Sequence, residues 1–312
     1  MKIFAFMRNL MPLLFFSLLA FSLKAYAQEI PEVSAEDVEK QQDSIGESIE
    51  NGVNQFLYKH GITPTTISYH PNGEVLISTQ YFKELKEQYM LLVDDVTQDE
   101  PSVDTLSTLR PNRSKFSDDG SFIIYNEIED KGKKGQQTYL RKYSSLGEME
   151  RKRNLKEELN LGSLYYFSMD KDGIFYYYAF FGSSSDKNGI YASLCSSEPC
   201  TGAIPIYLDT EELIYFSPLR IGRNMLLMAV QGKNDSRLNG IYFARYRDGR
   251  WRLPLKVQGL RYGYSFDFVN DNIISYKEAV TGNVIFVRLD EILKSFPEDA
   301  RERRRNPLNL NQ

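Results

Sequence analysis

Short apolar segments alternate with polar turns along most of the chain, and one pattern returns about every fifty residues. Its clearest copy is residues 115–125, where a strand runs into a tight turn at Asp118, Asp119 and Gly120, and an apolar strand follows. Asp is well tolerated in such turns, and Gly readily adopts the positive φ that a two-strand reversal often needs. The segment is therefore expected to be a β-hairpin.

Related copies stand before and after this hairpin. Gly73 ends an earlier turn, Asp172 and Gly173 end a later one, and degenerate copies occupy residues 216–230 and 266–276. A second, independent motif repeats with a similar spacing: its tyrosines, Tyr139, Tyr191 and Tyr242, are separated by 52 and 51 residues. Two motifs that share one period indicate a repeated structural unit.

A repeat of forty to fifty residues with about four short strands is typical of a propeller blade. We therefore predict an all-β protein, a β-propeller of residues 62–296 with five four-stranded antiparallel blades, six being the alternative. The last copy, residues 264–289, holds only about three strands. Residues 54–58 are expected to complete that blade as an N-terminal strand, because such closure leaves no open sheet edge.

The two ends of the chain differ from the repeats. Residues 1–27 combine Lys2 and Arg8, an apolar run and a small-residue cleavage site, which is the pattern of a secretory signal peptide. Retention of this segment as an anchor is the alternative. Residues 28–61 are expected to form a leader with a short helix, and residues 297–312 a basic tail.

Charge and export narrow the class of partner. The formal net charge is -4, and removal of Lys2, Arg8 and Lys24 with the signal peptide would change it to -7. An acidic surface argues against nucleic acid or an anionic membrane as the main partner. We expect a periplasmic or secreted monomer that has no membrane span after cleavage.

The chain contains two cysteines, Cys195 and Cys200, which flank a predicted turn. In an exported chain such a pair favours a disulfide across a hairpin over a redox or metal site, because C-x-x-C spacing and a nearby His are absent. No metal and no cofactor are expected.

Aromatic residues are most frequent in the third repeat and in the hairpin that follows it. Most of these side chains are expected in the core, since a blade packed between two neighbours is apolar on both faces. One or two tyrosines can instead reach the rim or the channel and stack on a sugar or a peptide. The candidate binding residues are Tyr165, Tyr166, Tyr176, Tyr178 and Trp251.

Residues 239–254, with the turn Asp248 and Gly249, resemble a hairpin of the WD40-like repeats found in the propeller domain of TolB and in other bacterial envelope proteins. Residues 116–120 are similar to the W-S-P-D-G turn of those repeats, with Phe in place of Trp and Asp in place of Pro. The resemblance implies a propeller over residues 65–289. TolB also has an α/β domain before its propeller, for which this chain has too few residues.

These observations favour a non-catalytic propeller that binds a protein or glycan partner in the bacterial cell envelope. The alternative is a glycoside hydrolase or similar enzyme that uses carboxylates in the propeller channel. No G-x-S-x-G elbow is present, and the chain has only two histidines, His60 and His70. Convergent carboxylates in the channel would favour the enzyme, and an aromatic patch on one rim would favour the binding protein.

Overall fold

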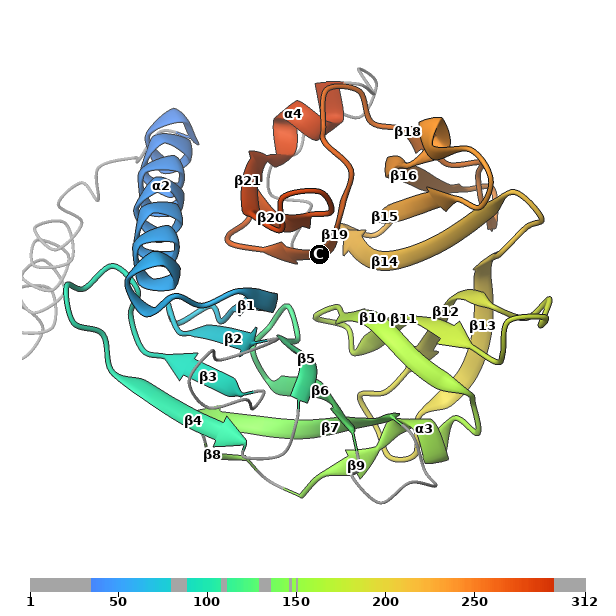
Figure 1. Ribbon diagram of the computed structural model, residues 1–312, viewed down its shortest axis with the longest axis horizontal. Helices are drawn as coiled ribbons and strands as arrows, with labels where there is room; N and C mark the ends of the chain where they lie inside the picture. The colour runs from blue at the N-terminus through green and yellow to red at the C-terminus, as the bar shows by residue number, and fades with distance from the viewer. Residues whose placement is uncertain are drawn as a thin grey trace, which may run out of the picture. The chain divides into compact units, whose positions relative to one another are not determined.

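The computed structural model describes residues 35–79, 89–107, 111–128, 136–145, 148–149 and 151–294. The expected signal peptide and basic tail lie outside these residues. The chain divides into two units, residues 1–41 and residues 42–312. The first contributes only the beginning of helix α2 to the description, and the second contains every strand described below (Figure 1).

The strands form five antiparallel sheets, one for each sequence repeat, and all pairing lies within a sheet. The elements, in chain order, are α2 (Ala35–His60); blade 1, β1 (Pro64–Tyr69), β2 (Val75–Thr79), β3 (Met90–Val93) and β4 (Val103–Ser107); blade 2, β5 (Pro111–Phe116), β6 (Phe122–Ile128), β7 (Gln136–Ser145), β8 (Glu148–Met149), β9 (Arg153–Asn154) and α3 (Leu155–Glu158); blade 3, β10 (Ser163–Met169), β11 (Ile174–Phe180), β12 (Gly189–Leu194) and β13 (Thr201–Leu208); blade 4, β14 (Leu213–Ile221), β15 (Met225–Gly232), η1 (Ser236–Leu238), β16 (Gly240–Arg247), β17 (Arg250–Trp251) and β18 (Leu255–Lys256); and blade 5, β19 (Gly263–Phe268), β20 (Ile273–Glu278), β21 (Val284–Arg288) and α4 (Leu289–Lys294).

The first strand of each blade lies innermost and contacts the first strand of the next. These contacts run from β1 to β5, β10, β14 and β19, and β19 returns to β1. The ring is therefore closed, and the predicted five-bladed β-propeller is confirmed (Figure 1). The six-bladed alternative is wrong.

The turns between the first and second strands contain the predicted glycines. Gly73, Gly120 and Gly173 have φ values of 102°, 74° and 76°, a region in which a side chain is strained. In blade 4 the turn between β16 and β17 has Asp248 at φ 53° and Gly249 at φ 74°.

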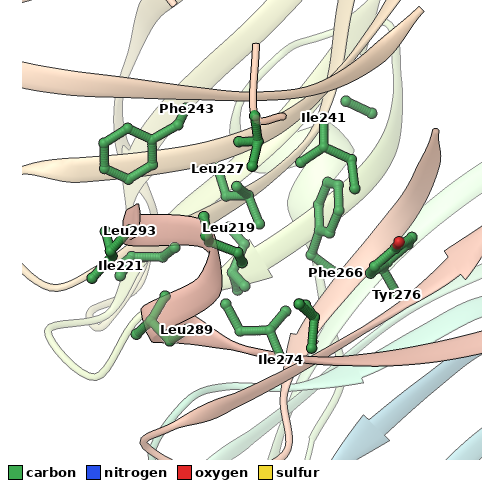
Figure 2. Close-up of a cluster of buried hydrophobic side chains, with 14 of the residues drawn as sticks. Leu219, Ile221, Leu227, Ile241, Phe243, Phe266, Ile274, Tyr276, Leu289 and Leu293 are labelled. Carbon is green, nitrogen blue, oxygen red and sulfur yellow. The ribbon is translucent and has the colours of Figure 1, made fainter. Parts of the chain in front are cut away.

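Apolar side chains fill the space between neighbouring blades. Figure 2 shows the cluster between blades 4 and 5, in which Leu227 and Phe243 face Phe266 and Ile274, and α4 adds Leu293. Each blade is thus covered on both faces, and its second strand is mostly buried along its length rather than alternating between buried and exposed residues. The consecutive residues Phe175, Tyr176 and Tyr177 of β11 illustrate this, since all are buried.

The expected closing strand is wrong, because residues 54–58 belong to helix α2. The apolar residues Ile49, Val53, Phe56 and Leu57 follow one another at intervals of four, three and one, which places them on one face of a helix and not of a strand. Blade 5 contains three strands within the described residues.

Helix α2 performs the closure by packing across the seam between blades 1 and 5. Val53 and Phe56 are buried in one cluster with Ile67 of blade 1, and Val284 and Phe286 of blade 5 pack against the same cluster. An ion pair between Asp43 and Arg288 joins the helix to β21. The approach is close: a Cβ on Gly52 would lie 2.1 Å from the carbonyl oxygen of Val96.

Cys195 and Cys200 lie at disulfide-bonding distance, with 2.14 Å between their sulfur atoms. Their loop is held against blade 2 by Arg153, which donates to the carbonyl oxygen of Cys195 at 3.1 Å and to that of Ser197 at 2.9 Å. Glu158 binds the guanidinium of Arg153 at 2.6 Å and accepts from the Cys200 amide at 2.9 Å. The loop therefore connects two blades.

Among the helices in the described part of the chain, none combines the length and the apolar character needed to cross a membrane.

We predict that Gly52→Ala lowers the free energy of unfolding by about 1–3 kcal/mol, because the added methyl group meets a backbone carbonyl that cannot turn away. Urea denaturation followed by circular dichroism measures this change. The control is Asn51→Ala at the neighbouring exposed position, which is expected to be neutral or slightly stabilising. Equal losses in both variants would contradict the packing of α2 on blade 1.

We also predict that replacing Cys195 and Cys200 together by Ala lowers the free energy of unfolding by about 2 kcal/mol or less, since the ring closed by the disulfide is small. Differential scanning calorimetry with and without reductant provides the test. The double variant should be insensitive to reductant, and an unchanged transition in the reduced parent protein would refute the bond.

Candidate functional site

Two groups of side chains lie at opposite ends of the inner strands β5, β10, β14 and β19. The group near the N-terminal ends of these strands, which Lys277 of β20 joins beside Tyr264, is called the tyrosine end. The group near their C-terminal ends is called the carboxylate end. The tyrosine end consists of Arg113, Tyr166, Phe216, Tyr264 and Lys277. The carboxylate end consists of Lys115, Asp118, Asp170, Arg220 and Asp267.

At the tyrosine end, aromatic rings from three blades meet beside an arginine. The ring of Tyr166 lies 4.9 Å from that of Phe216 and 5.6 Å from that of Tyr264, measured between centroids. The guanidinium of Arg113 covers the Tyr166 ring at 4.1 Å from the centroid. Such stacking leaves the N–H groups in the guanidinium plane available to an acceptor.

A repeated backbone irregularity shapes this end. Tyr166, Ser217 and Ser265 stand at equivalent bulges in β10, β14 and β19, and their φ values are 47°, 54° and 61°. Left-handed backbone at a residue other than Gly costs about 1–3 kcal/mol and is frequent at functional positions. Sequence analysis missed the bulges, because none of them contains a glycine.

The positive charge at the tyrosine end is not neutralised. The guanidinium of Arg113 makes no hydrogen bond within the described residues, and its Nε atom is buried. Lys277 donates to the carbonyl oxygen of Pro64 at 2.7 Å. Burial, and secondarily the charge of Arg113, lowers the pKa of the Lys277 ammonium, which indicates two cations in partly desolvated surroundings.

A small cavity, partly open to solvent and with room for about one water molecule, adjoins this group at the seam between blades 1 and 5. Lys277, Ser265 and Thr66 are among its lining residues. The Ser265 side chain is buried, and its hydroxyl oxygen has no hydrogen-bond partner in the described structure. An ammonium group and an unused hydroxyl suit an anionic or hydroxyl-bearing ligand.

At the carboxylate end, three acids from different blades gather around two bases. Lys115 Nζ lies 3.6 Å from Asp267 Oδ2, and Arg220 Nη1 lies 3.9 Å from Asp170 Oδ2. The Asp118 amide donates to the Met169 carbonyl at 2.9 Å and so places Asp118 between blades 2 and 3. Among the residues described, no group of three or more His, Cys, Asp or Glu side chains is arranged to hold a metal ion.

The turn carboxylates at this end have different roles. Asp119 accepts from the Ser117 hydroxyl at 2.6 Å, and Asp170 Oδ1 accepts from the Asp172 and Ile174 amides at 3.0 and 2.9 Å. These two acids stabilise turns. Asp118 has no such partner, and burial, followed by the charges of Asp267 and Asp170, raises its pKa well above the usual range.

The predicted aromatic binding residues are dispersed. Tyr166 lies at the tyrosine end, and Tyr165 and Tyr178 lie near it, although the Tyr178 hydroxyl is engaged with Asp209 at 2.8 Å. Tyr176 is buried and accepts from Arg220 at the carboxylate end, where burial raises its pKa to about 12. Trp251 packs on Tyr246 with 5.4 Å between ring centroids, on the outer edge of blade 4. The structure therefore brings together three of the five residues.

Arg113, Lys277 and Asp267 were not singled out in the sequence. Each occupies an inner or second strand of a blade, and a charged residue in a strand expected to be buried is the signal that could have identified them.

No family model matches the sequence, and no curated protein matches it. Solved structures with a similar arrangement of strands include a protein of unknown function from Dyadobacter fermentans, with 11% identity over 73% of this chain and 82% of that chain and a TM-score of 0.46. They also include a gluconolactonase of Xanthomonas campestris, with 10% identity, 74% coverage of each chain and a TM-score of 0.45.

A third similar structure is a xylan β-1,4-xylosidase from Bacillus halodurans, with 13% identity, a TM-score of 0.45 and coverage of 73% of this chain and 52% of that chain. These values are too low to assign an activity or a ligand to this protein. The resemblance to the WD40-like repeats of TolB finds no specific support among the matches.

We predict that Asp118→Asn raises the melting temperature at pH 7 by about 2–4 °C. The folded-state pKa of Asp118 is raised, so folding stability decreases as pH rises through that pKa, and Asn avoids this loss. The difference between variant and parent should vanish below about pH 4, where both states of the parent are protonated.

Melting curves from pH 4 to pH 8 provide the measurement. Asp172→Asn removes an exposed charge from the neighbouring turn and serves as the control, with little change expected at any pH. A destabilised Asp118→Asn variant at pH 7 would show that the carboxylate is compensated in the folded protein.

Proposed function

We propose that this protein is a non-catalytic recognition module of the bacterial cell envelope that binds a glycan through an acidic sugar residue at the tyrosine end. The proposal rests on the guanidinium of Arg113. This group stacks on the Tyr166 ring and has no hydrogen-bond acceptor among the described residues. A planar guanidinium fits a carboxylate in bidentate geometry.

The neighbouring groups support a sugar as the carrier of that carboxylate. The cavity beside Lys277 has room for about one water molecule, so a sugar would lie across its opening rather than inside it. Ser265 provides an unused hydroxyl group at its wall, whereas the Thr66 hydroxyl is already engaged with the backbone of Ser114. Tyrosine rings are common partners of sugar rings.

The envelope is proposed as the location for two reasons. The sequence begins with the pattern of a signal peptide, and Cys195 and Cys200 lie at disulfide-bonding distance, which suits an oxidising compartment. The ligand is therefore sought among extracytoplasmic glycans.

A carboxylate-dependent hydrolase is the less favoured function. Such an enzyme needs two carboxyl groups that both reach the substrate. At the carboxylate end, Asp170 is engaged in its turn and Asp267 is paired with Lys115, so Asp118 alone is available to a substrate.

We predict that Arg113→Gln weakens binding of oligogalacturonate at least tenfold, which corresponds to about 1.4 kcal/mol. The reason is loss of the charge-assisted pair with the sugar carboxylate. Isothermal titration calorimetry of the full chain at 0.1 M salt provides the measurement, with neutral maltooligosaccharide as the ligand control.

The matched protein control is Arg261→Gln. Arg261 is an exposed arginine paired with Glu278 at 3.2 Å, so this variant removes the same charge from the same blade that contains Lys277. It should bind as the parent does. Equal binding of acidic and neutral oligosaccharides, equal losses in both variants, or preference for poly-glutamate would overturn the proposal.

A further inference from the structure

We propose that the outer hairpin of blade 4, residues 245–256, is a docking surface for an anionic lipid membrane. This surface combines exposed apolar side chains with arginines that have no acidic partner. The proposal is independent of the ligand at the tyrosine end, because the hairpin belongs to the outer strands of its blade and the tyrosine end to the inner strands.

The first argument is the exposure of large apolar side chains on this hairpin. Leu253 is 87% exposed, Leu255 59% and Tyr246 42%. Trp251 is half-buried and packs on Tyr246. Strands β17 and β18 pair only with β16 among the described residues, so no further strand covers their outer edge (Figure 1). Exposed apolar groups that gather in one place are typical of an interaction surface.

The second argument is the charge of the hairpin. Residues 245–256 contain four arginines, one lysine and one aspartate, which gives this segment a net charge of +4 in a chain whose net charge is -4. The acidic character of the whole chain therefore does not extend to this edge of blade 4. A positive surface complements the phosphate groups of anionic lipids.

Two of the arginines face each other without an anion between them. Arg247 and Arg250 are directly opposite in the pairing of β16 with β17, and like charges in this arrangement repel. The acid of the hairpin, Asp248, is paired with Arg252, and the guanidinium groups of Arg247 and Arg250 have no hydrogen bond or ion pair with another described residue. A lipid phosphate bound by both guanidinium groups would remove the repulsion.

The shape of the surface favours a membrane over a peptide. Leu253 lies between β17 and β18 and is exposed on nearly all sides, so it forms a protrusion rather than the wall of a groove. Pro254 has no N–H group and interrupts the same strand, which makes its edge a poor template for an added peptide strand. A bilayer accepts protruding apolar side chains, and tryptophan and tyrosine are enriched at the level of its headgroups.

The test uses the fluorescence of Trp251, which is the only tryptophan in the chain. The full chain is titrated with vesicles of phosphatidylglycerol and phosphatidylcholine in equal amounts, and with vesicles of phosphatidylcholine alone. With the anionic vesicles, we expect the emission to shift to shorter wavelength and to be quenched by brominated acyl chains, because Trp251 enters the interface. An increase from about 0.1 M to about 1 M salt should weaken binding, since salt screens the attraction between arginine and phosphate.

Two pairs of variants separate the apolar and the cationic parts of the surface. Leu253→Ser should weaken binding about tenfold. Val280→Ser removes an apolar side chain that is 86% exposed on blade 5, and it should bind as the parent does. Arg247→Gln should weaken binding about fivefold, whereas Arg261→Gln, which removes the same charge from blade 5, should not. All four side chains are exposed, so the variants should keep the melting curve of the parent.

Residues 1–27 contain an apolar run that can bind lipid by itself, so attachment of the protein without a shift and quenching of Trp251 emission would overturn the proposal. Equal shifts with neutral and anionic vesicles, or equal losses in Leu253→Ser and Val280→Ser, would also overturn it. A larger shift with poly-glutamate than with vesicles would assign the surface to an acidic peptide instead. A shift that grows with protein concentration in the absence of vesicles would assign it to a second copy of the chain.

Discussion

Closure of the ring between blades 5 and 1 is the constraint on which the rest of this structure depends. Within the described residues no strand is shared across the seam, so closure combines the contact of β19 with β1 and apolar packing beneath α2, where Val53 and Phe56 meet residues of both blades. Each end of the axis is assembled from side chains of different blades. Lys277 reaches Pro64 across the seam, and Lys115 of blade 2 meets Asp267 of blade 5. If the seam opened, both groups would separate.

The same five inner strands produce two ends of opposite character. Because each strand begins at one end of the axis and finishes at the other, residues only two to five positions apart are separated along the axis. Arg113 and Asp118 are such a pair on blade 2, the first beside tyrosine rings and the second among carboxylates. A buried charge without a partner is effective in attracting a ligand of the opposite sign, because the surroundings screen it less than water does.

Several departures from ordinary backbone geometry and hydrogen bonding occur at the axis. The clusters between blades are apolar and closely packed, as Figure 2 shows for blades 4 and 5. At the axis stand three left-handed residues that are not glycine, together with unused polar atoms of Arg113, Ser265 and Asp267. Features that reduce stability and recur in one place are typical of a functional region, where strained backbone and unpaired polar groups are retained because they serve ligand binding.

The sequence by itself determined the repeat, the five hairpins and the all-β class, because turn chemistry at residues such as Gly120 and Gly173 and the pattern of strands are local properties. It did not predict helix α2 as the closing element, although Val53 and Phe56 already had helical spacing. Of the predicted binding residues, Tyr166 lies near the axis beside Arg113, whereas Trp251 lies on the outer edge of blade 4. The tertiary structure alone decided which charged groups meet their partners, because Arg113 with Tyr166 and Lys115 with Asp267 are distant in sequence and adjacent only after the ring has closed.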